Sequence, residues 1–215
     1  NVTIPVMIQH QLFWVRPHLY KTLSGQDGTT TLASCYITDV TKYLIHEELL
    51  YEKTHKDELT GLFNRYALYY HFELHGNRAP ITSFYFDIDN FKTFNDKYGH
   101  DIGDEVLVQF SNRLKALADD SFFSYRLGGD EFYCLLFGKN LEEAKKHVEK
   151  IKESISYVEI NNVTEKLSVS IGVVQSKDDI THKMELFMKE ADRLMYISKK
   201  NGKNTATYGE FVVFK

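Results

Sequence analysis

The 215-residue sequence lacks the features that mark disulfide-stabilised and membrane-spanning proteins. Its two cysteines, Cys35 and Cys134, both lie in apolar, strand-like runs, so we expect reduced core residues rather than a disulfide. No apolar run approaches membrane-spanning length, and no signal peptide is visible. These absences predict a cytoplasmic domain without direct membrane contact, which could equally be the cytoplasmic part of a longer, membrane-anchored protein.

The chain also lacks an excess of positive charge, internal repeats and low-complexity tracts. Its formal net charge of −4 and pI near 6.2 argue against nonspecific binding to nucleic acid or to anionic membranes. With 43% hydrophobic residues, the chain can bury one good core and part of another.

One segment carries most of the functional information. Residues 126–132 read RLGGDEF and lie between apolar, aromatic runs at residues 122–125 and 132–137, a pattern that predicts a β-hairpin. Two adjacent glycines let the backbone approach a ligand closely, and the two carboxylates that follow can hold a divalent cation against phosphate. Taken alone, the same peptide is equally typical of a solvated turn.

A second segment, residues 81–107, reads ITSFYFDIDNFKTFNDKYGHDIGDEVL. It predicts an apolar strand over residues 81–88 that ends in Asp87 and Asp89, and carboxylates so placed suit Mg²⁺, which keeps several waters and takes other ligands from phosphates. Alternatives remain open, because Asp87 can simply point to water. Asp89 can share the face of Asp87 or cap the next helix.

Together with DELTGLFNR at residues 57–65 and ADRLMYISKKNGKN at residues 191–204, these segments resemble the GGDEF family of diguanylate cyclases. The resemblance implies an α/β (α+β) fold over residues 57–215, a palm-like domain related to nucleotidyl cyclases and polymerases. Its central, mostly antiparallel sheet is flanked by helices. It also implies an enzyme that condenses two GTP into cyclic di-GMP and releases two pyrophosphates, which requires a homodimer because each subunit holds one GTP.

The resemblance assigns the metal and catalytic residues. Asp87, the backbone carbonyl of Ile88 and Asp130 would bind Mg²⁺ or Mn²⁺, with two ions expected in each active site. Glu131 would assist near the 3′-hydroxyl or a second metal, and Lys92, on the first turn of the helix that follows the strand, would contact the triphosphate.

The remaining assignments concern the substrate. Lys199 and Lys203 lie four residues apart and would project to one face if the helix from residue 182 continues that far. They correspond to a Lys and an Arg that contact phosphates in the family, so Lys203 keeps the charge but gives up bidentate geometry. The full set of implied substrate-binding residues is Phe91, Lys92, Asn95, Asp104, Gly128, Gly129, Lys199 and Lys203.

Asn95 and Asp104 would read the base. A buried carboxylate at position 104 could accept the N1–H and N2–H₂ donors of guanine, which adenine lacks on that edge, so Asp104 favours GTP over ATP. The alternative is that these acids only cap a helix over residues 101–118, and both interpretations hold together if Asp101 is the cap and Asp104 the reader.

One departure from the family is visible. Many members carry Arg-x-x-Asp shortly before the glycine turn, where it forms an inhibitory product site, whereas residues 119–122 here read DDSF. The missing arginine predicts that cyclic di-GMP does not inhibit this protein with high affinity.

Other segments predict the rest of the architecture. Residues 1–41 look like the last strands of a PAS sensor domain with a turn at residues 24–28, and residues 42–56 predict a connecting helix with Ile45 and Leu49 on one side. Further predicted elements are helices over residues 64–76, 141–155 and 182–200 and a strand over residues 167–174.

His71 and His75 are spaced to bind zinc, but no third ligand is evident, so exposure or packing is the expected role. Two other functional hypotheses compete with an active cyclase: a catalytically silent GTP-binding regulatory domain, and a cyclase that makes a mixed adenine–guanine dinucleotide. The complete set of Asp87, Asp130 and Glu131 disfavours the first, and Asp104 disfavours the second.

Overall fold

A computed structural model describes residues 2–8, 10–24, 30–160 and 163–212 of the chain, which divides between Lys53 and Thr54 into two compact units. None of the helices in these described ranges is both long enough and apolar enough to cross a lipid bilayer.

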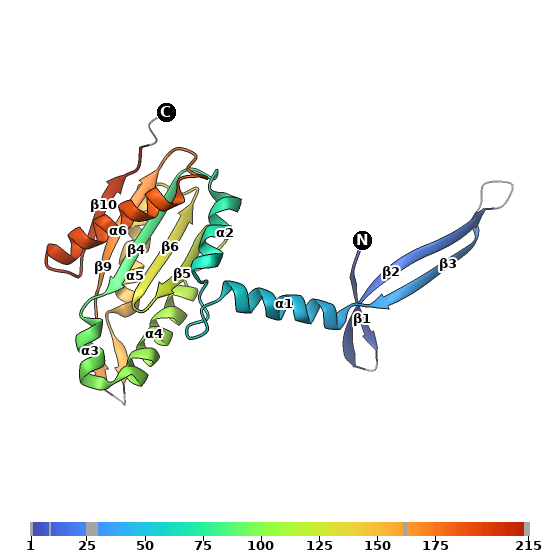
Figure 1. The fold of residues 1–215 in the computed structure, drawn as a ribbon, viewed down its shortest axis with the longest axis horizontal. Coiled ribbons are helices and arrows are strands. Elements are labelled where there is room, and N and C mark those ends of the chain that lie inside the picture. The colour runs from blue at the N-terminus through green and yellow to red at the C-terminus, as the bar shows by residue number, and fades with distance from the viewer. Residues whose placement is uncertain (1, 9, 25–29, 161–162, 213–215) are drawn as a thin grey trace. The chain divides into compact units, whose positions relative to one another are not determined.

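The N-terminal unit is a three-stranded antiparallel sheet in the order β1-β2-β3 (Figure 1). Its strands are β1 (Ile4–Ile8), β2 (Gln11–Ser24) and β3 (Thr30–Asp39). Strands were expected here, whereas residues 25–28 of the predicted turn lie outside the described residues. The assignment of these strands to a sensor domain stays a prediction.

Helix α1 (Thr41–His55) matches the predicted connecting helix within one residue. It begins at a polar turn in which the Thr41 N–H donates to Asp39 Oδ1 (2.9 Å) and the Trp14 N–H donates to Thr41 Oγ1 (2.8 Å). The hydrogen bonds from Thr41 lower the pKa of Asp39. None of the described side chains of α1 is buried, and Ile45 and Leu49 are each 51% exposed.

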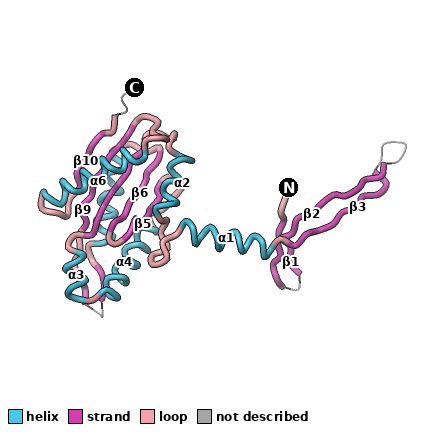
Figure 2. The backbone as a smooth tube through the Cα atoms, viewed as in Figure 1, coloured by secondary structure: helices cyan, strands magenta, loops and turns pink. Residues whose placement is uncertain are grey.

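The C-terminal unit is built on a five-stranded sheet in the order β10-β9-β4-β6-β5 (Figures 1 and 2). Only the β9-β10 pair is parallel, so the predicted, mostly antiparallel sheet is confirmed. The strands are β4 (Ile81–Ile88), β5 (Phe122–Gly128), β6 (Glu131–Phe137), β9 (Val169–Ser176) and β10 (Ala206–Glu210).

The helices of this unit include the four that were predicted with bounds, whose ends differ by at most three residues, and the helix expected after the first strand, for which no bounds were predicted. They are α2 (Arg65–His75), α3 (Phe91–Tyr98), α4 (His100–Lys115), α5 (Leu141–Ile155) and α6 (Met184–Lys200). Strand β10 and the small hairpin of β7 (Val158–Ile160) and β8 (Val163–Glu165) were not predicted, because each is short and none carries a strong apolar run.

Strand β4 lies at the centre of the sheet and is buried on both faces. Phe84 and Phe86 pack in a core formed with α3, α4 and α5, whereas Tyr85 packs in a second core formed with α2 and α6 (Figure 1). A strand covered on both faces has no solvent-facing side, which explains why residues 81–86, including the polar Thr82 and Ser83, are all buried.

Helix α6 approaches the sheet most closely at Gly172 of β9. A Cβ atom built on Gly172 would lie 1.9 Å from the carbonyl oxygen of Ala191 and 2.3 Å from the backbone nitrogen of Met195. Since both atoms belong to the helix backbone, any larger residue at this position would force α6 away from the sheet.

The two cysteines differ in environment. Cys134 is fully buried in β6, as predicted, and burial raises the pKa of its thiol to about 12. Cys35 in β3 is exposed, so the prediction that it is a core residue is wrong. Its neighbours Tyr36 and Ile37 are 54% and 63% exposed, so both faces of β3 are open here, which local sequence cannot reveal.

His71 of α2 is a packing residue rather than a zinc ligand. It is 6% exposed, its ring packs against Phe63 and Phe123, and its Nδ1 lies 3.0 Å from the hydroxyl oxygen of Tyr125 in β5. Within the described residues no group of three or more His, Cys, Asp and Glu side chains is placed to hold a metal ion. Burial, reinforced by the charge of His75, lowers the pKa of His71 to about 4.

We therefore expect the free energy of unfolding to decrease as pH falls from about 6.5 towards 4. Because the folded-state pKa of His71 lies below its unfolded value, the unfolded chain takes up the proton first; the stability is complete above the unfolded pKa and is lost on acidification. This group contributes a slope of at most about 1.4 kcal/mol per pH unit.

Urea unfolding at several pH values between 4 and 7.5, on the wild type and His71→Gln, measures this slope. The exposed His46→Gln variant of α1 serves as the control and should keep the wild-type slope. An identical slope in His71→Gln would contradict the assignment.

Candidate active site

The candidate site lies where β4 ends beside the turn between β5 and β6. Asp87 pairs with Glu131 of β6 on one side and with Ser170 of β9 on the other, and the Ile88 N–H donates to the carbonyl of Asp130 (3.4 Å). The sheet register therefore brings the strand-end carboxylate next to the two acids of the turn, as the sequence predicts.

Asp87 is the most perturbed acid of the site. Its side chain is 14% exposed, and its Oδ2 lies 2.8 Å from the Nζ of Lys199 in α6. Burial raises the pKa of Asp87 to about 6; the Lys199 ammonium opposes this shift, while the negative charges of Asp130 and Glu131 add to it. Asp130 and Glu131 thus lie close enough to disfavour the charge of Asp87, and an additional cation would relieve that repulsion.

This donor set fits a cation that needs few protein ligands. The site offers the Asp87 and Asp130 carboxylates and the backbone carbonyl of Ile88, all at the edge of the sheet. Mg²⁺ keeps several waters and completes its shell with phosphate oxygens, so it does not require a closed protein cage.

The turn itself depends on its glycines for backbone conformation. Gly128 has φ of 144° and Gly129 has φ of 53°, both in the region that other residues rarely adopt. A Cβ atom at either position would meet no atom within 4 Å, so the space beside the turn is open. Both glycines are exposed, which leaves their backbone accessible to a ligand.

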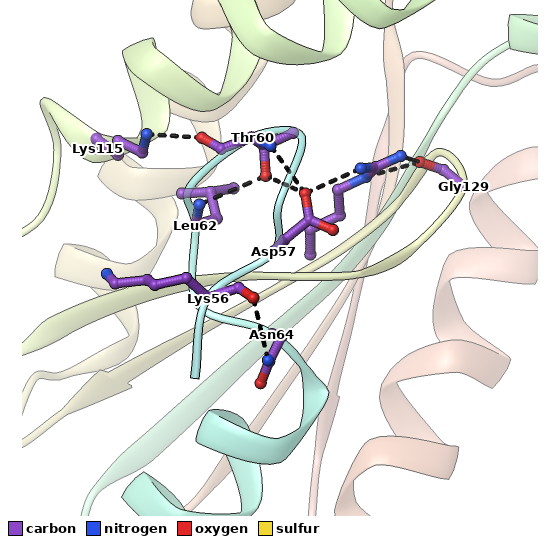
Figure 3. Close-up of polar contacts among 8 residues, drawn as sticks. Lys56, Asp57, Thr60, Leu62, Asn64, Lys115 and Gly129 are labelled. Atoms are coloured by element: carbon purple, nitrogen blue, oxygen red, sulfur yellow. Dashed lines mark hydrogen bonds and ion pairs between the residues drawn. The ribbon is translucent and has the colours of Figure 1, made fainter. Parts of the chain in front are cut away.

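Arg126 connects this turn to the loop that contains Asp57. Its Nε and Nη2 donate to the carbonyl of Gly129 (3.0 and 2.8 Å), and its Nη1 donates to Asp57 Oδ1 at 2.9 Å. The same Asp57 oxygen accepts hydrogen bonds from the backbone N–H and hydroxyl of Thr60 (2.9 and 2.6 Å; Figure 3). Burial would raise the pKa of Asp57, but the bonds from Thr60 and Arg126 outweigh it and lower that pKa.

The loop that contains Asp57 is fixed to neighbouring elements. Lys115 at the end of α4 donates to the carbonyl of Thr60 (2.6 Å), and Asn64 Nδ2 donates to the carbonyl of Lys56 at 3.2 Å (Figure 3). The DELT segment therefore acts as a support for the glycine turn. Arg126 and Asp57 are 69 positions apart in the chain, so their contact, and with it the role of Arg126, is visible only in the structure.

The α3 and α4 helices carry the residues expected to contact the substrate. Lys92 lies exposed on the first turn of α3, whereas the Phe91 side chain is buried. Asn95 packs against Gly103, at which a Cβ atom would lie 2.0 Å from Asn95 Oδ1. That amide oxygen is buried without a hydrogen-bond partner, which leaves an acceptor available for a ligand donor.

Two predictions about the acids of α4 are wrong. Asp104 is exposed, not buried, because its side chain lies on the solvent side of a helix whose buried residues include Val106 and Phe110. Asp101 is not the helix cap, because α4 begins at His100 and Gly99 occupies the cap position without a side-chain hydrogen bond. A residue already inside the first turn cannot act as the N-cap.

Lys199 and Lys203 do not share a helix face, because α6 ends at Lys200. Lys203 lies in the following turn with φ of 65°, and its Nζ donates to Asn90 Oδ1 at 2.6 Å. The site still gathers both lysines, since Lys199 contacts Asp87 and Lys203 contacts the residue that precedes α3.

Residues 119–122, which read DDSF, form a compact turn. Asp119 Oδ1 accepts hydrogen bonds from the N–H and hydroxyl of Ser121 (both 2.7 Å) and from the N–H of Phe122 (2.9 Å). These bonds, those from Ser121 first, lower the pKa of Asp119.

Comparison with known proteins decides the family. The model of the family described as "Diguanylate cyclase, GGDEF domain" matches residues 54–205. The chain belongs to the GGDEF family. This confirms the resemblance drawn from the four motifs.

Named relatives span several bacteria. The chain is 34% identical over 209 residues to the signaling protein YkoW of Bacillus subtilis, covering 91% of this chain and 26% of that protein. It is 33% identical over 172 residues to a diguanylate cyclase of Vibrio cholerae, covering 78% of this chain and 53% of the relative. The chain thus spans about a quarter to a half of the length of these relatives.

Solved structures agree with the GGDEF fold. The coiled coil and GGDEF domain of DgcB from Caulobacter crescentus, in complex with c-di-GMP, aligns with a TM-score of 0.71 at 26% identity, covering 79% of this chain and 93% of that one. Diguanylate cyclase SiaD from Pseudomonas aeruginosa, in complex with its activator SiaC, aligns with a TM-score of 0.69 at 25% identity, covering 78% and 67%.

We expect the Arg126–Asp57 pair to stabilise the GGDEF domain cooperatively. A double-mutant cycle with Arg126→Gln and Asp57→Asn, measured by urea unfolding, should give a coupling energy of about 1–2 kcal/mol, because both side chains are mostly buried and directly bonded. The exposed Lys145–Glu142 pair of α5, cut by Lys145→Gln and Glu142→Gln, is the control and should show no measurable coupling. Additive effects of the first pair would contradict the supporting role of Arg126.

Proposed function

We propose that this protein is an active diguanylate cyclase that condenses two GTP into cyclic di-GMP and two pyrophosphates. The observation that carries the proposal is the cluster of Asp87, Asp130 and Glu131 at one sheet edge, with Lys199 in contact with Asp87. A domain kept only to bind nucleotide would not need three neighbouring carboxylates, two of which disfavour the charge of Asp87, whereas metal-assisted phosphoryl chemistry uses such a set.

Asp87, the carbonyl of Ile88 and Asp130 would hold Mg²⁺ or Mn²⁺, with two ions in each active site. When bound, the metal neutralises charge on the α-phosphate and lowers the pKa of the attacking 3′-hydroxyl. Glu131, at the register position opposite Asp87, would accept or orient the proton of that hydroxyl.

The positively charged residues of the site would bind the triphosphate. Lys92 extends from the first turn of α3, where the backbone N–H groups also favour anions, and Lys199 and Lys203 approach from the end of α6 and the turn after it. The open backbone of Gly128 and Gly129 lets a phosphate come close to the turn.

Asn95 and Asp104 would read the guanine base. The unpaired amide oxygen of Asn95 accepts a donor, and the exposed Asp104 becomes desolvated when the base covers it. An acid matched to two guanine donors then selects GTP over ATP.

Catalysis would require a homodimer, because one half-site holds one GTP. We further propose that residues 1–41 belong to a PAS-like sensor domain and that residues 42–56 transmit its state. The exposed Ile45 and Leu49 of α1 are available for pairing with a second copy, and one related structure contains a coiled coil beside its GGDEF domain.

The primary test is turnover. Incubation of the protein with GTP and Mg²⁺ should yield cyclic di-GMP, identified by mass, at a rate that rises more steeply than enzyme concentration because two subunits must meet. Asp130→Asn should reduce the rate at least about 100-fold while the thermal unfolding curve stays that of a folded domain. The exposed Asp120→Asn variant, outside the site, should retain wild-type activity.

Two outcomes would count against the proposal. GTP binding without any turnover at high enzyme concentration would favour a silent regulatory domain. Full activity in folded Asp130→Asn would place the chemistry elsewhere.

Base selection is tested separately. Calorimetry with nonreactive GTP and ATP analogues should show a preference for the guanine analogue that falls about tenfold or more in Asp104→Ala. Asp101→Ala, an exposed acid three residues earlier on the same helix, is the matched control and should leave the preference unchanged. Equal affinity of the wild type for both analogues would refute the base-reading role.

A further inference from the structure

Asp89, two residues beyond Asp87, is a buried acid with its own set of partners. It is 4% exposed, and its carboxylate accepts hydrogen bonds from the hydroxyls of Ser170 (Oδ1, 2.6 Å) and Ser168 (Oδ2, 2.6 Å) and from the backbone N–H of Asn204 (Oδ2, 2.9 Å). No Lys, Arg or His forms an ion pair with Asp89 in the described part of the chain. A buried carboxylate needs hydrogen-bond donors, and these three neutral groups supply them to Asp89.

One of these donors belongs to an unusual turn. Gly202, Lys203 and Asn204 have φ of 104°, 65° and 48°, so three consecutive residues adopt the left-handed region. Non-glycine residues rarely do so, and such a conformation persists only where surrounding contacts enforce it. The contacts here are the bond from the Asn204 N–H to Asp89 and that from the Lys203 N–H to the carbonyl of Ser198 (3.1 Å).

The turn determines where the Lys203 ammonium lies. With the backbone held at Asn204, the Lys203 side chain reaches across to Asn90 Oδ1 at 2.6 Å, and Asn90 directly follows Asp89. Asp89 therefore holds both partners of the contact between Lys203 and Asn90. Asn90 is its neighbour in the segment just after β4, and its carboxylate binds the turn that carries Lys203.

We propose that Asp89 is a positioning residue that binds the left-handed turn at residues 202–204 to the end of β4 and so places Lys203 for contact with a nucleotide phosphate. This rests on the proposed function, because the phosphate belongs to the GTP assigned above. Asp89 is then neither a metal ligand nor a helix cap, because the N-cap of α3 is Asn90, which makes no capping hydrogen bond with its side chain, and both Asp89 oxygens accept hydrogen bonds from other donors.

The sign of the effect separates this role from simple electrostatics. Removal of a negative charge beside a triphosphate site should strengthen nucleotide binding if charge alone matters. Removal of the anchor should weaken binding, because Lys203 then loses its fixed position.

The test combines Asp89→Asn, Lys203→Ala and the double variant, with affinity for a nonreactive GTP analogue and Mg²⁺ measured by calorimetry. We expect Asp89→Asn to weaken binding about tenfold in the wild-type background and less than about twofold in the Lys203→Ala background. The Mg²⁺ concentration that gives half-maximal turnover should stay within about twofold of the wild type, since the metal ligands are unchanged. Ser168→Ala and Ser170→Ala keep the charge, remove one donor each and should weaken binding in the same direction.

A second readout needs no nucleotide. Hydrogen exchange of the Asn204 amide should accelerate in Asp89→Asn but not in Asp96→Asn, an exposed acid on α3. Tighter analogue binding in Asp89→Asn, equal losses in both Lys203 backgrounds, or unchanged exchange at Asn204 would each overturn the inference. Failure of the wild type to bind the analogue would instead overturn the proposed function, together with the role of Asp89 toward phosphate.

Discussion

The burial of β4 on both faces sets the conditions for everything at its end. A strand enclosed by α4 and α5 on one face and by α2 and α6 on the other delivers its last side chains into a poorly solvated edge. Carboxylates placed there need partners, and the chain supplies two different kinds. Asp87 faces an ammonium and two further acids, whereas Asp89 is satisfied by neutral donors alone. The first arrangement leaves capacity for a cation and the second does not.

The other side of the site is the turn at Gly128 and Gly129, whose position depends on contacts with other residues. Its glycines permit the backbone conformation but fill no space, so its position must come from outside the hairpin. Arg126 provides that support by joining the Gly129 carbonyl to Asp57. Hydrogen bonds through Arg126 therefore connect the DELT loop (residues 57–60) to the glycine turn, and this loop directly follows α1.

Local patterns were enough to predict most of the fold and the carboxylates of the site. Residues 81–88 and 141–155 match their predicted bounds, because the first segment is rich in apolar and aromatic residues and the second has a capping box at Asn140 and Glu143. The cap of α4 could not be predicted, since it depends on the backbone of Gly99 and not on a polar side chain. Nor could the networks of Arg126 and Asp89, whose partners lie 69 and between 79 and 115 positions away. Such contacts arise from the sheet register, which no short segment specifies.

The proposed role of Lys203 in phosphate contact connects the long-range hydrogen bonds to the local turn. A guanidinium orients itself on a phosphate through its rigid, bidentate donors, whereas an ammonium is a point charge on a long stem and gains no such alignment. Its placement must therefore come from the backbone that carries it. In this chain that backbone is a turn of three left-handed residues attached to a buried acid, and the lysine end is held by Asn90. In the proposed site, the weaker geometric specificity of the lysine is thus offset by a more strongly determined turn, and the second acid of the Asp-x-Asp pair would serve substrate positioning rather than metal binding.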